Sequence, residues 1–281
     1  MKDRLVNRTG NALVRTSKDG GRTIRLPLLP LVVGGLLGLF LLAPWPFAHK
    51  AHAVLHGLCA QRPSHTFDLA GQLLPFDARM TGIYGGFAIA TLYLIVRGRF
   101  RAFRLPSVPT LVVLAAFVGV MAIDGFNALL DDLGNPVYPP DNRLRLATGL
   151  LAGVALAVAL CFLLSTTLWR RGDWTAPTVR GPGEALGIAA LAAPFALLPL
   201  SGWGWLHAPL SLVLLLSAVA AVAMLMTATV LLATGRDRQH ERMADAQVSA
   251  TIGVLAGVAF ILLVAAGRFW LEREFGLRTL T

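Results

Sequence analysis

Seven stretches of mostly apolar residues, separated by short polar segments, set the pattern of this chain. A helix needs about 20 residues to cross the hydrocarbon core of a bilayer, and these stretches are near or above that length. They cover residues 26–42, 80–96, 108–130, 146–169, 184–200, 209–234 and 246–270. Lipid offers no hydrogen-bond partners to the backbone, so each stretch is expected to be α-helical. The pattern predicts an all-α, polytopic transmembrane helix bundle with about seven spans.

Composition and charge agree with this class and orient it. Only 14% of the residues are charged, against about a quarter in a soluble domain. The net charge of +10 comes from arginine-rich polar segments that all lie on one side of the predicted bundle, at residues 1–25, 97–104, 170–171 and 236–242. Basic loops stay in the cytoplasm. We therefore expect a multi-pass plasma-membrane protein with the N-terminus in the cytoplasm and the C-terminus outside, and no nucleic-acid partner.

The same pattern divides the chain into four parts. Residues 1–25 form a basic cytoplasmic tail, expected to contact anionic lipids of the bilayer. The apolar stretch that follows is longer than a usual signal-peptide core, so we interpret it as an uncleaved span. Residues 26–169 form a four-span core with an outer His/Cys loop at 47–79, residues 170–183 a cytoplasmic linker, and residues 184–281 a three-span C-terminal part.

Small residues four positions apart mark possible helix contacts, because they let helix backbones approach closely in lipid. Ser249, Gly253 and Gly257 form a ladder of three, which predicts packing. Gly82 with Gly86, and Gly149 with Gly153, are single pairs. Glycine is common in membrane helices, so these two pairs alone do not predict a contact.

The loop at 47–79 is the main candidate for chemistry. If residues 47–60 form a helix, His49, His52, His56 and Cys59 share one face at spacings of three, four and three. His65 and Asp77 follow in the same loop. Imidazole, thiolate and carboxylate groups bind zinc and other transition metals. We predict a metal site formed by His52, His56, Cys59, His65 and Asp77. The alternative is an interfacial helix whose histidines face water.

A second polar group lies in the third span. Asp124, Asn127 and Asp131 fall on one helical face, and a carboxylate inside an apolar helix usually faces a partner or a pathway. Asp124, with Asn127 and Arg79, is predicted to support the metal site or to carry protons. Alternatively, the helix ends near Gly125 and the acids are solvated. Arg143 and Arg145 are expected to pair with Asp131 or Asp132.

Two sequence stretches resemble a known family. The segments CAQRPSHTF and LPFDARMTGIYGG are similar to the signature of the Domain of Unknown Function 2085 (DUF2085) family of membrane proteins, over roughly residues 50–155. The matching positions are Cys59, Gln61, Pro63, Phe67, Gly71, Pro75, Arg79, Gly82, Ile83 and Tyr84. The resemblance implies a thiolate-rich site, but Ala60, Asp77 and Met80 stand where the family has histidine and paired cysteines. The resemblance implies no particular activity for this chain.

These observations leave three hypotheses for function. The first is a binding or accessory protein that holds zinc or another transition metal at the outer face. The second is an enzyme acting on a lipid or quinone at that interface. The third is a small-solute or proton-coupled transporter with Asp124 in its path. A tunnel leading from the lipid phase would favour the second hypothesis, and a continuous polar path the third.

Overall fold

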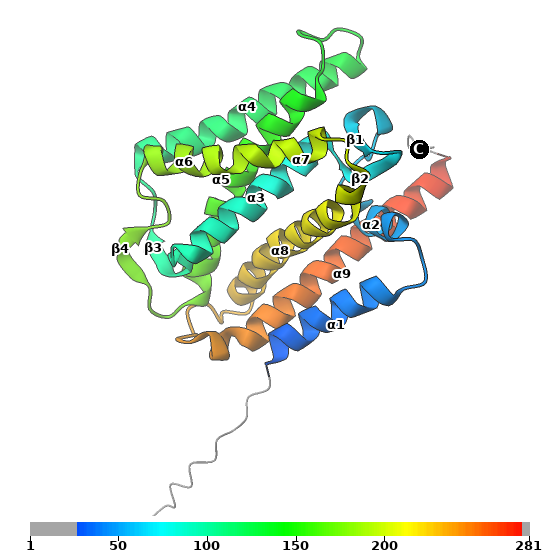
Figure 1. Ribbon diagram of the computed structural model, residues 1–281. Helices are drawn as coiled ribbons and strands as arrows, with labels where there is room; N and C mark the ends of the chain where they lie inside the picture. The colour runs from blue at the N-terminus through cyan, green and yellow to red at the C-terminus, as the bar shows by residue number, and fades with distance from the viewer. Residues whose placement is uncertain (1–26, 277–281) are drawn as a thin grey trace, which may run out of the picture.

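A computed structural model describes residues 27–276 as a bundle of roughly parallel helices (Figure 1). The predicted tail at 1–25 lies outside the described residues. Within them, six helical segments are long and apolar enough to cross a membrane. The helices are α1 (Leu28–Leu42), α2 (Phe47–Leu55), α3 (Ala78–Val96), α4 (Val108–Asp132), α5 (Asn142–Leu168), α6 (Pro182–Ala192), α7 (Leu197–Leu200), α8 (His207–Ala233) and α9 (Met243–Phe275).

The predicted helical, polytopic architecture is confirmed. The predicted spans correspond to α1, α3, α4, α5, the α6–α7 segment, α8 and α9. The α6–α7 segment passes through a 3₁₀ turn at Ala193–Ala196, where Pro194 cannot donate a backbone hydrogen bond. Helix α1 has only 15 residues, which span roughly 22 Å at 1.5 Å each. It is therefore shorter than the hydrocarbon core, and it packs beside α9.

Helices α3 and α5 form the centre of the bundle, and glycine brings them together. A Cβ atom on Gly82 would overlap the Leu146 carbonyl oxygen, and one on Gly153 would overlap that of Ile83. Gly86 and Gly149 lie equally close to the backbone of the facing helix. Both glycine pairs are therefore packing sites that face each other.

The Ser249–Gly257 ladder packs α9 against α8, as predicted. A Cβ on Gly253 would overlap the side chain of Thr227, and one on Gly257 would lie 3.0 Å from the backbone nitrogen of Ala223. The last three helices thereby join the same bundle as the first four, because α8 also contacts α3 and α5.

Two short sheets, which the sequence pattern did not predict, close the ends of the bundle (Figure 1). Strands β1 (Thr66–Leu69) and β2 (Gln72–Asp77) form an antiparallel hairpin within the His/Cys loop. Its turn residues Ala70 and Gly71 have φ of 55° and 86°, as tight hairpin turns require. At the opposite end, β3 (Ala102–Arg104) pairs in parallel with β4 (Asp173–Pro177), inside the predicted linker. We refer to these as the β1–β2 end and the β3–β4 end.

Candidate functional site

The His/Cys loop does not form the single helix predicted at 47–60. Helix α2 ends at Leu55, and residues 56–58 turn so that Gly57 presses against the backbone of Val264 and Ala265 in α9. Gln61 then has a φ of 53°, which no α-helix contains. The expected face of His49, His52, His56 and Cys59 is therefore broken, because tertiary contact with α9 ends the helix one turn early.

His56 is buried and fully engaged. Its Nδ1 lies 3.0 Å from Gln61 Oε1 and its Nε2 lies 2.9 Å from the Glu272 carboxylate. The Gln61 amide nitrogen donates to the carbonyl oxygens of His52 and Pro75, so its oxygen must accept from His56. The imidazole also stacks on Phe269, with ring centroids 4.1 Å apart. His56 therefore holds the loop against the last turns of α9.

His52 meets a histidine that the sequence pattern did not single out. The Nε2 atoms of His52 and His207 lie 3.1 and 3.0 Å from the Leu73 carbonyl oxygen. A carbonyl only accepts, so both rings donate their Nε2–H to it. Burial lowers the pKa of His52, which keeps that ring neutral at pH 7. His207 is the first residue of α8 and directly follows an aromatic turn. That position is the only feature of the sequence that could have indicated its contact with the loop.

Cys59 and Asp77, two members of the predicted set, are in direct contact. The Cys59 sulfur accepts from the backbone N–H groups of Gln61 at 3.4 Å and Asp77 at 3.3 Å. Asp77 caps α3 by accepting from the backbone N–H of Met80 at 2.8 Å. Burial, and then the Asp77 carboxylate, raise the pKa of the Cys59 thiol to about 12. The thiol is therefore protonated at neutral pH.

This burial leads to a prediction about cysteine reactivity. In a Cys161→Ala background, the native protein is expected to resist N-ethylmaleimide at pH 8, because roughly one Cys59 thiol in 10,000 is ionised at a pKa of about 12. Intact-mass spectrometry follows the addition of label. An Ala60→Cys variant is the control, since residue 60 is exposed, and it should label fully. Rapid labelling of Cys59 in folded protein would contradict the burial described.

The predicted metal-ligating set is not assembled in the described part of the chain. No group of three or more His, Cys, Asp or Glu side chains that could hold a metal ion occurs within residues 27–276. His65 is half-buried in the turn before β1, and burial followed by the charges of Arg145 and Arg62 lowers its pKa. A zinc or other transition-metal site stays a prediction, and these contacts do not support it.

Two residues of the polar group predicted in the third span, Asp124 and Asn127, are buried and form hydrogen bonds with the connection between α4 and α5. Asp124 is 3% exposed, and its Oδ2 accepts from Arg79 Nη2 at 2.6 Å while its Oδ1 accepts from Tyr138 at 3.2 Å. Asn127 holds the backbone of Val137 and Tyr138 through its side-chain amide. Helix α4 continues to Asp132, so the alternative of an early end near Gly125 is wrong.

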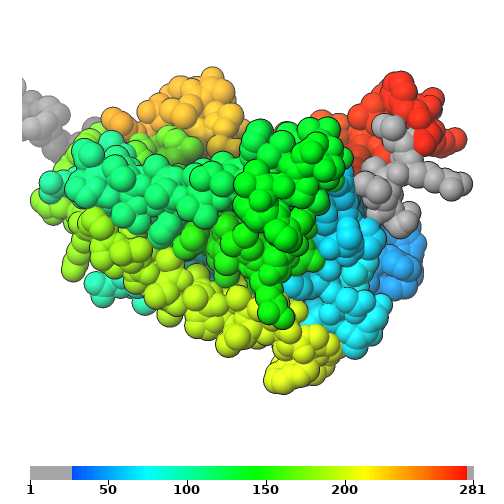
Figure 2. Space-filling view, turned by 90° about the horizontal axis from the view of Figure 1, so that it is seen from above, coloured from blue at the N-terminus to red at the C-terminus, as the bar shows by residue number. Residues whose placement is uncertain are grey.

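The arginines that open α5 do not pair as predicted. Asp132 pairs with Arg62 at 2.7 Å, because the β1–β2 end folds over the end of α4. Arg145 is 5% exposed, and its Nη1 donates to Asn142 Oδ1 at 3.0 Å. Figure 2 shows the connection between α4 and α5 (green) lying against the hairpin region (cyan). In this arrangement three arginines from separate segments, Arg62, Arg79 and Arg145, gather at the β1–β2 end.

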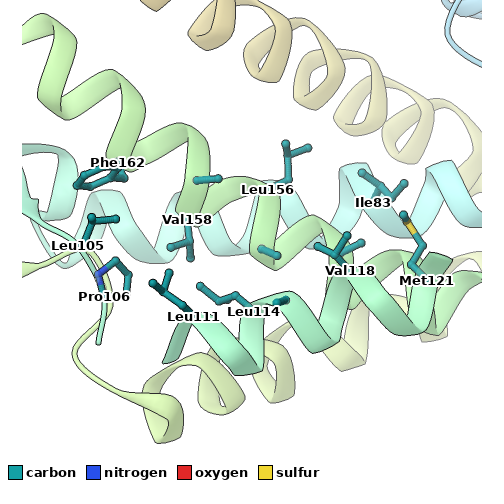
Figure 3. Close-up of a pocket in the computed structure, with 14 residues that line it drawn as sticks. Ile83, Leu105, Pro106, Leu111, Leu114, Val118, Met121, Leu156, Val158 and Phe162 are labelled. Atoms are coloured by element: carbon teal, nitrogen blue, oxygen red, sulfur yellow. The ribbon is translucent and has the colours of Figure 1, made fainter. Parts of the chain in front are cut away.

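An apolar groove of about 620 Å³ lies between α4 and α5, with Ile83 of α3 also in its lining (Figure 3). All its lining side chains are apolar. Leu105, Pro106 and Phe162 mark the β3–β4 end of the groove, and Ile83 and Met121 the other end. The sequence pattern missed this groove, since it depends on how far α4 stands from α5.

These features define a multi-pass membrane protein with a buried polar cluster at one end of an apolar groove between its helices. The profile of the DUF2085 family, described as predicted membrane proteins, matches residues 59–159. An uncharacterized protein of Methanothermobacter thermautotrophicus is 34% identical over 104 residues, which are 36% of this chain and 82% of that protein. The chain therefore belongs to the DUF2085 family, as its sequence motifs suggested. No solved structure matches it.

Proposed function

We propose that this protein binds an amphipathic membrane lipid or isoprenoid quinone, with the hydrocarbon chain in the α4–α5 groove and the polar group at the Arg79–Asp124–Tyr138 cluster. The observation that carries the proposal is the apolar groove of about 620 Å³. This volume lies within the range of small-molecule sites, about 300 to 1,000 Å³. The proposal keeps the lipid or quinone of the second hypothesis, which was an enzyme, but claims binding only and moves the site from the His/Cys loop to the groove.

The groove and the cluster are continuous along the helices. Arg79 precedes Ile83 by one turn of α3, and Asp124 follows Met121 by one turn of α4. Arg79 and Asp124 join at 2.6 Å across the same end of the groove. A ligand in the groove would therefore meet apolar side chains along most of its length and a guanidinium, a carboxylate and a phenol at its tip.

The chemistry of the lining favours a hydrocarbon chain over a hydrated solute. A solute or ion crossing this groove would meet no polar side chain along its walls, and loss of its water would be costly. A lipid chain needs no such compensation. Because the surrounding bilayer is equally apolar, the polar cluster must supply the specificity. The arginine-rich β3–β4 end is expected in the cytoplasm, so the polar cluster is expected in the outer leaflet.

Filling the groove tests the proposal. An Ala115→Phe variant puts a ring into the groove, and retention of co-purified lipid or quinone is expected to fall about tenfold, equal to about 1.4 kcal/mol. Ala116 is the matched control, because it is also exposed on α4 but does not line the groove. Extraction and mass spectrometry of the purified proteins give the measurement. Equal lipid content in wild type, Ala115→Phe and Ala116→Phe would refute the proposal.

A further inference from the structure

Arg145 is a buried cation that forms no ion pair with any residue between 27 and 276. It is 5% exposed, and although its charge acts on the Asp132 carboxylate, that carboxylate pairs directly with Arg62. Arg62 and Arg79, by contrast, pair with Asp132 and Asp124. The only hydrogen bond of the Arg145 guanidinium within that range runs to the neutral amide of Asn142. Removing a charge from water without a partner costs several kcal/mol.

The position of Arg145 in its helix adds to this cost. It lies in the first turns of α5, whose N-terminus begins at Asn142, and a helix N-terminus carries partial positive charge that disfavours a cation. The neighbouring carboxylate of Asp141 caps the helix by accepting from the backbone N–H of Arg143 at 2.8 Å, and within the described residues it forms no ion pair with Arg145. An anion from outside the chain would remove both penalties at once.

Arg145 also lies on the groove side of α5. Ala152 lies seven residues after Arg145, so it shares the same face of α5, and it lines the groove. The Tyr138 hydroxyl lies within reach of both arginine charges. Burial, and then the Asp124 carboxylate, raise its pKa, while the charges of Arg79 and Arg145 lower it. Each of the three helices around the groove thus carries a charged residue at the β1–β2 end, namely Arg79, Asp124 and Arg145.

We infer that Arg145, assisted by Arg79, binds the phosphate group of a membrane lipid whose chain occupies the α4–α5 groove. The inference rests on the proposed function and narrows its ligand to phosphate-bearing lipids, excluding neutral quinones. A guanidinium binds phosphate through paired N–H donors. A phosphate offers enough oxygens for two arginines, and it would supply the negative charge that Arg145 lacks.

Lipids that differ only in the phosphate test this assignment. Binding of dioleoyl phosphatidic acid and dioleoylglycerol to delipidated full-length protein in neutral detergent is measured by native mass spectrometry. Wild type should bind the phosphatidic acid at least tenfold more tightly than the dioleoylglycerol. Arg145→Gln is expected to weaken that binding about 10- to 100-fold, as loss of a charged hydrogen bond implies. Arg143→Gln, on the exposed side of the same turn, should leave it unchanged. Millimolar inorganic phosphate should not displace the lipid, because the chain contributes.

The outcomes separate the two proposals. The phosphate assignment is overturned if Arg145→Gln binds phosphatidic acid like wild type, or if wild type binds dioleoylglycerol as tightly as phosphatidic acid. In either case the Ala115→Phe variant still tests the groove proposal. If Ala115→Phe also binds like wild type, the groove proposal fails as well. Thermal unfolding of lipid-free Arg145→Gln gives an independent readout. Its melting temperature should equal or exceed that of wild type, whereas a merely structural arginine would lower it.

Discussion

Replacing Gly153 by alanine is expected to destabilise the protein by about 3 kcal/mol. The added methyl group would overlap the Ile83 carbonyl oxygen and crowd the Phe87 nitrogen. These are backbone atoms of α3, so the two central helices must separate to admit it. Overpacking usually costs about 1 to 3 kcal/mol, and the upper value applies here because no flexible side chain can yield. Thermal unfolding in detergent, followed by circular dichroism, measures the change.

Gly119 provides the matched control. It lies in α4, and a Cβ there would meet nothing within 4 Å. Gly119→Ala should leave the unfolding temperature unchanged or raise it slightly, because alanine is the better helix former. If Gly153→Ala and Gly119→Ala unfold at the same temperature, the close α3–α5 contact described here does not exist in the protein.

Removing the carboxylate of Asp124 is expected to cost about 3 kcal/mol of stability. The Asp124→Ala change leaves Arg79 without its partner in a site where the arginine side chain is 24% exposed and the aspartate 4%. Breaking a buried pair from one side typically costs 3 to 5 kcal/mol, and partial exposure of Arg79 favours the lower value. Tyr138 also loses its acceptor, so the connection between α4 and α5 should loosen. Equilibrium unfolding measures the loss.

The double variant Arg79→Met with Asp124→Leu distinguishes charge from shape. It removes both charges and should recover most of the stability, since replacing a buried pair by apolar residues is often neutral. Asp132→Ala breaks the exposed pair with Arg62 and is the control, with only a small expected change. A double variant as unstable as Asp124→Ala would show that the buried ion pair is not the cause.

Much of the fold follows from local pattern, and much of the site does not. The spans, the family motifs and the Ser249–Gly257 packing ladder depend on residues close together in the chain. The structure bears out the ladder and six of the about seven spans, and the family comparison bears out the motifs. The hairpin was missed although Ala70-Gly71 marks its turn, because the loop was interpreted through its histidine spacing. The burial of Asp124 was indicated by an acid in an apolar helix, but its partner Tyr138 was not.

The amino-acid sequence alone determined that this is a multi-span helical membrane protein of the DUF2085 family, because hydropathy and short motifs are local properties. Only the tertiary structure decided what the polar residues do. His56 lies 2.9 Å from Glu272, which is 216 positions away in the chain. This contact holds the loop against α9, and His56 does not share a helical face with Cys59. The groove and the uncompensated Arg145 likewise depend on how α3, α4 and α5 are spaced, and no pattern within a single helix records that spacing.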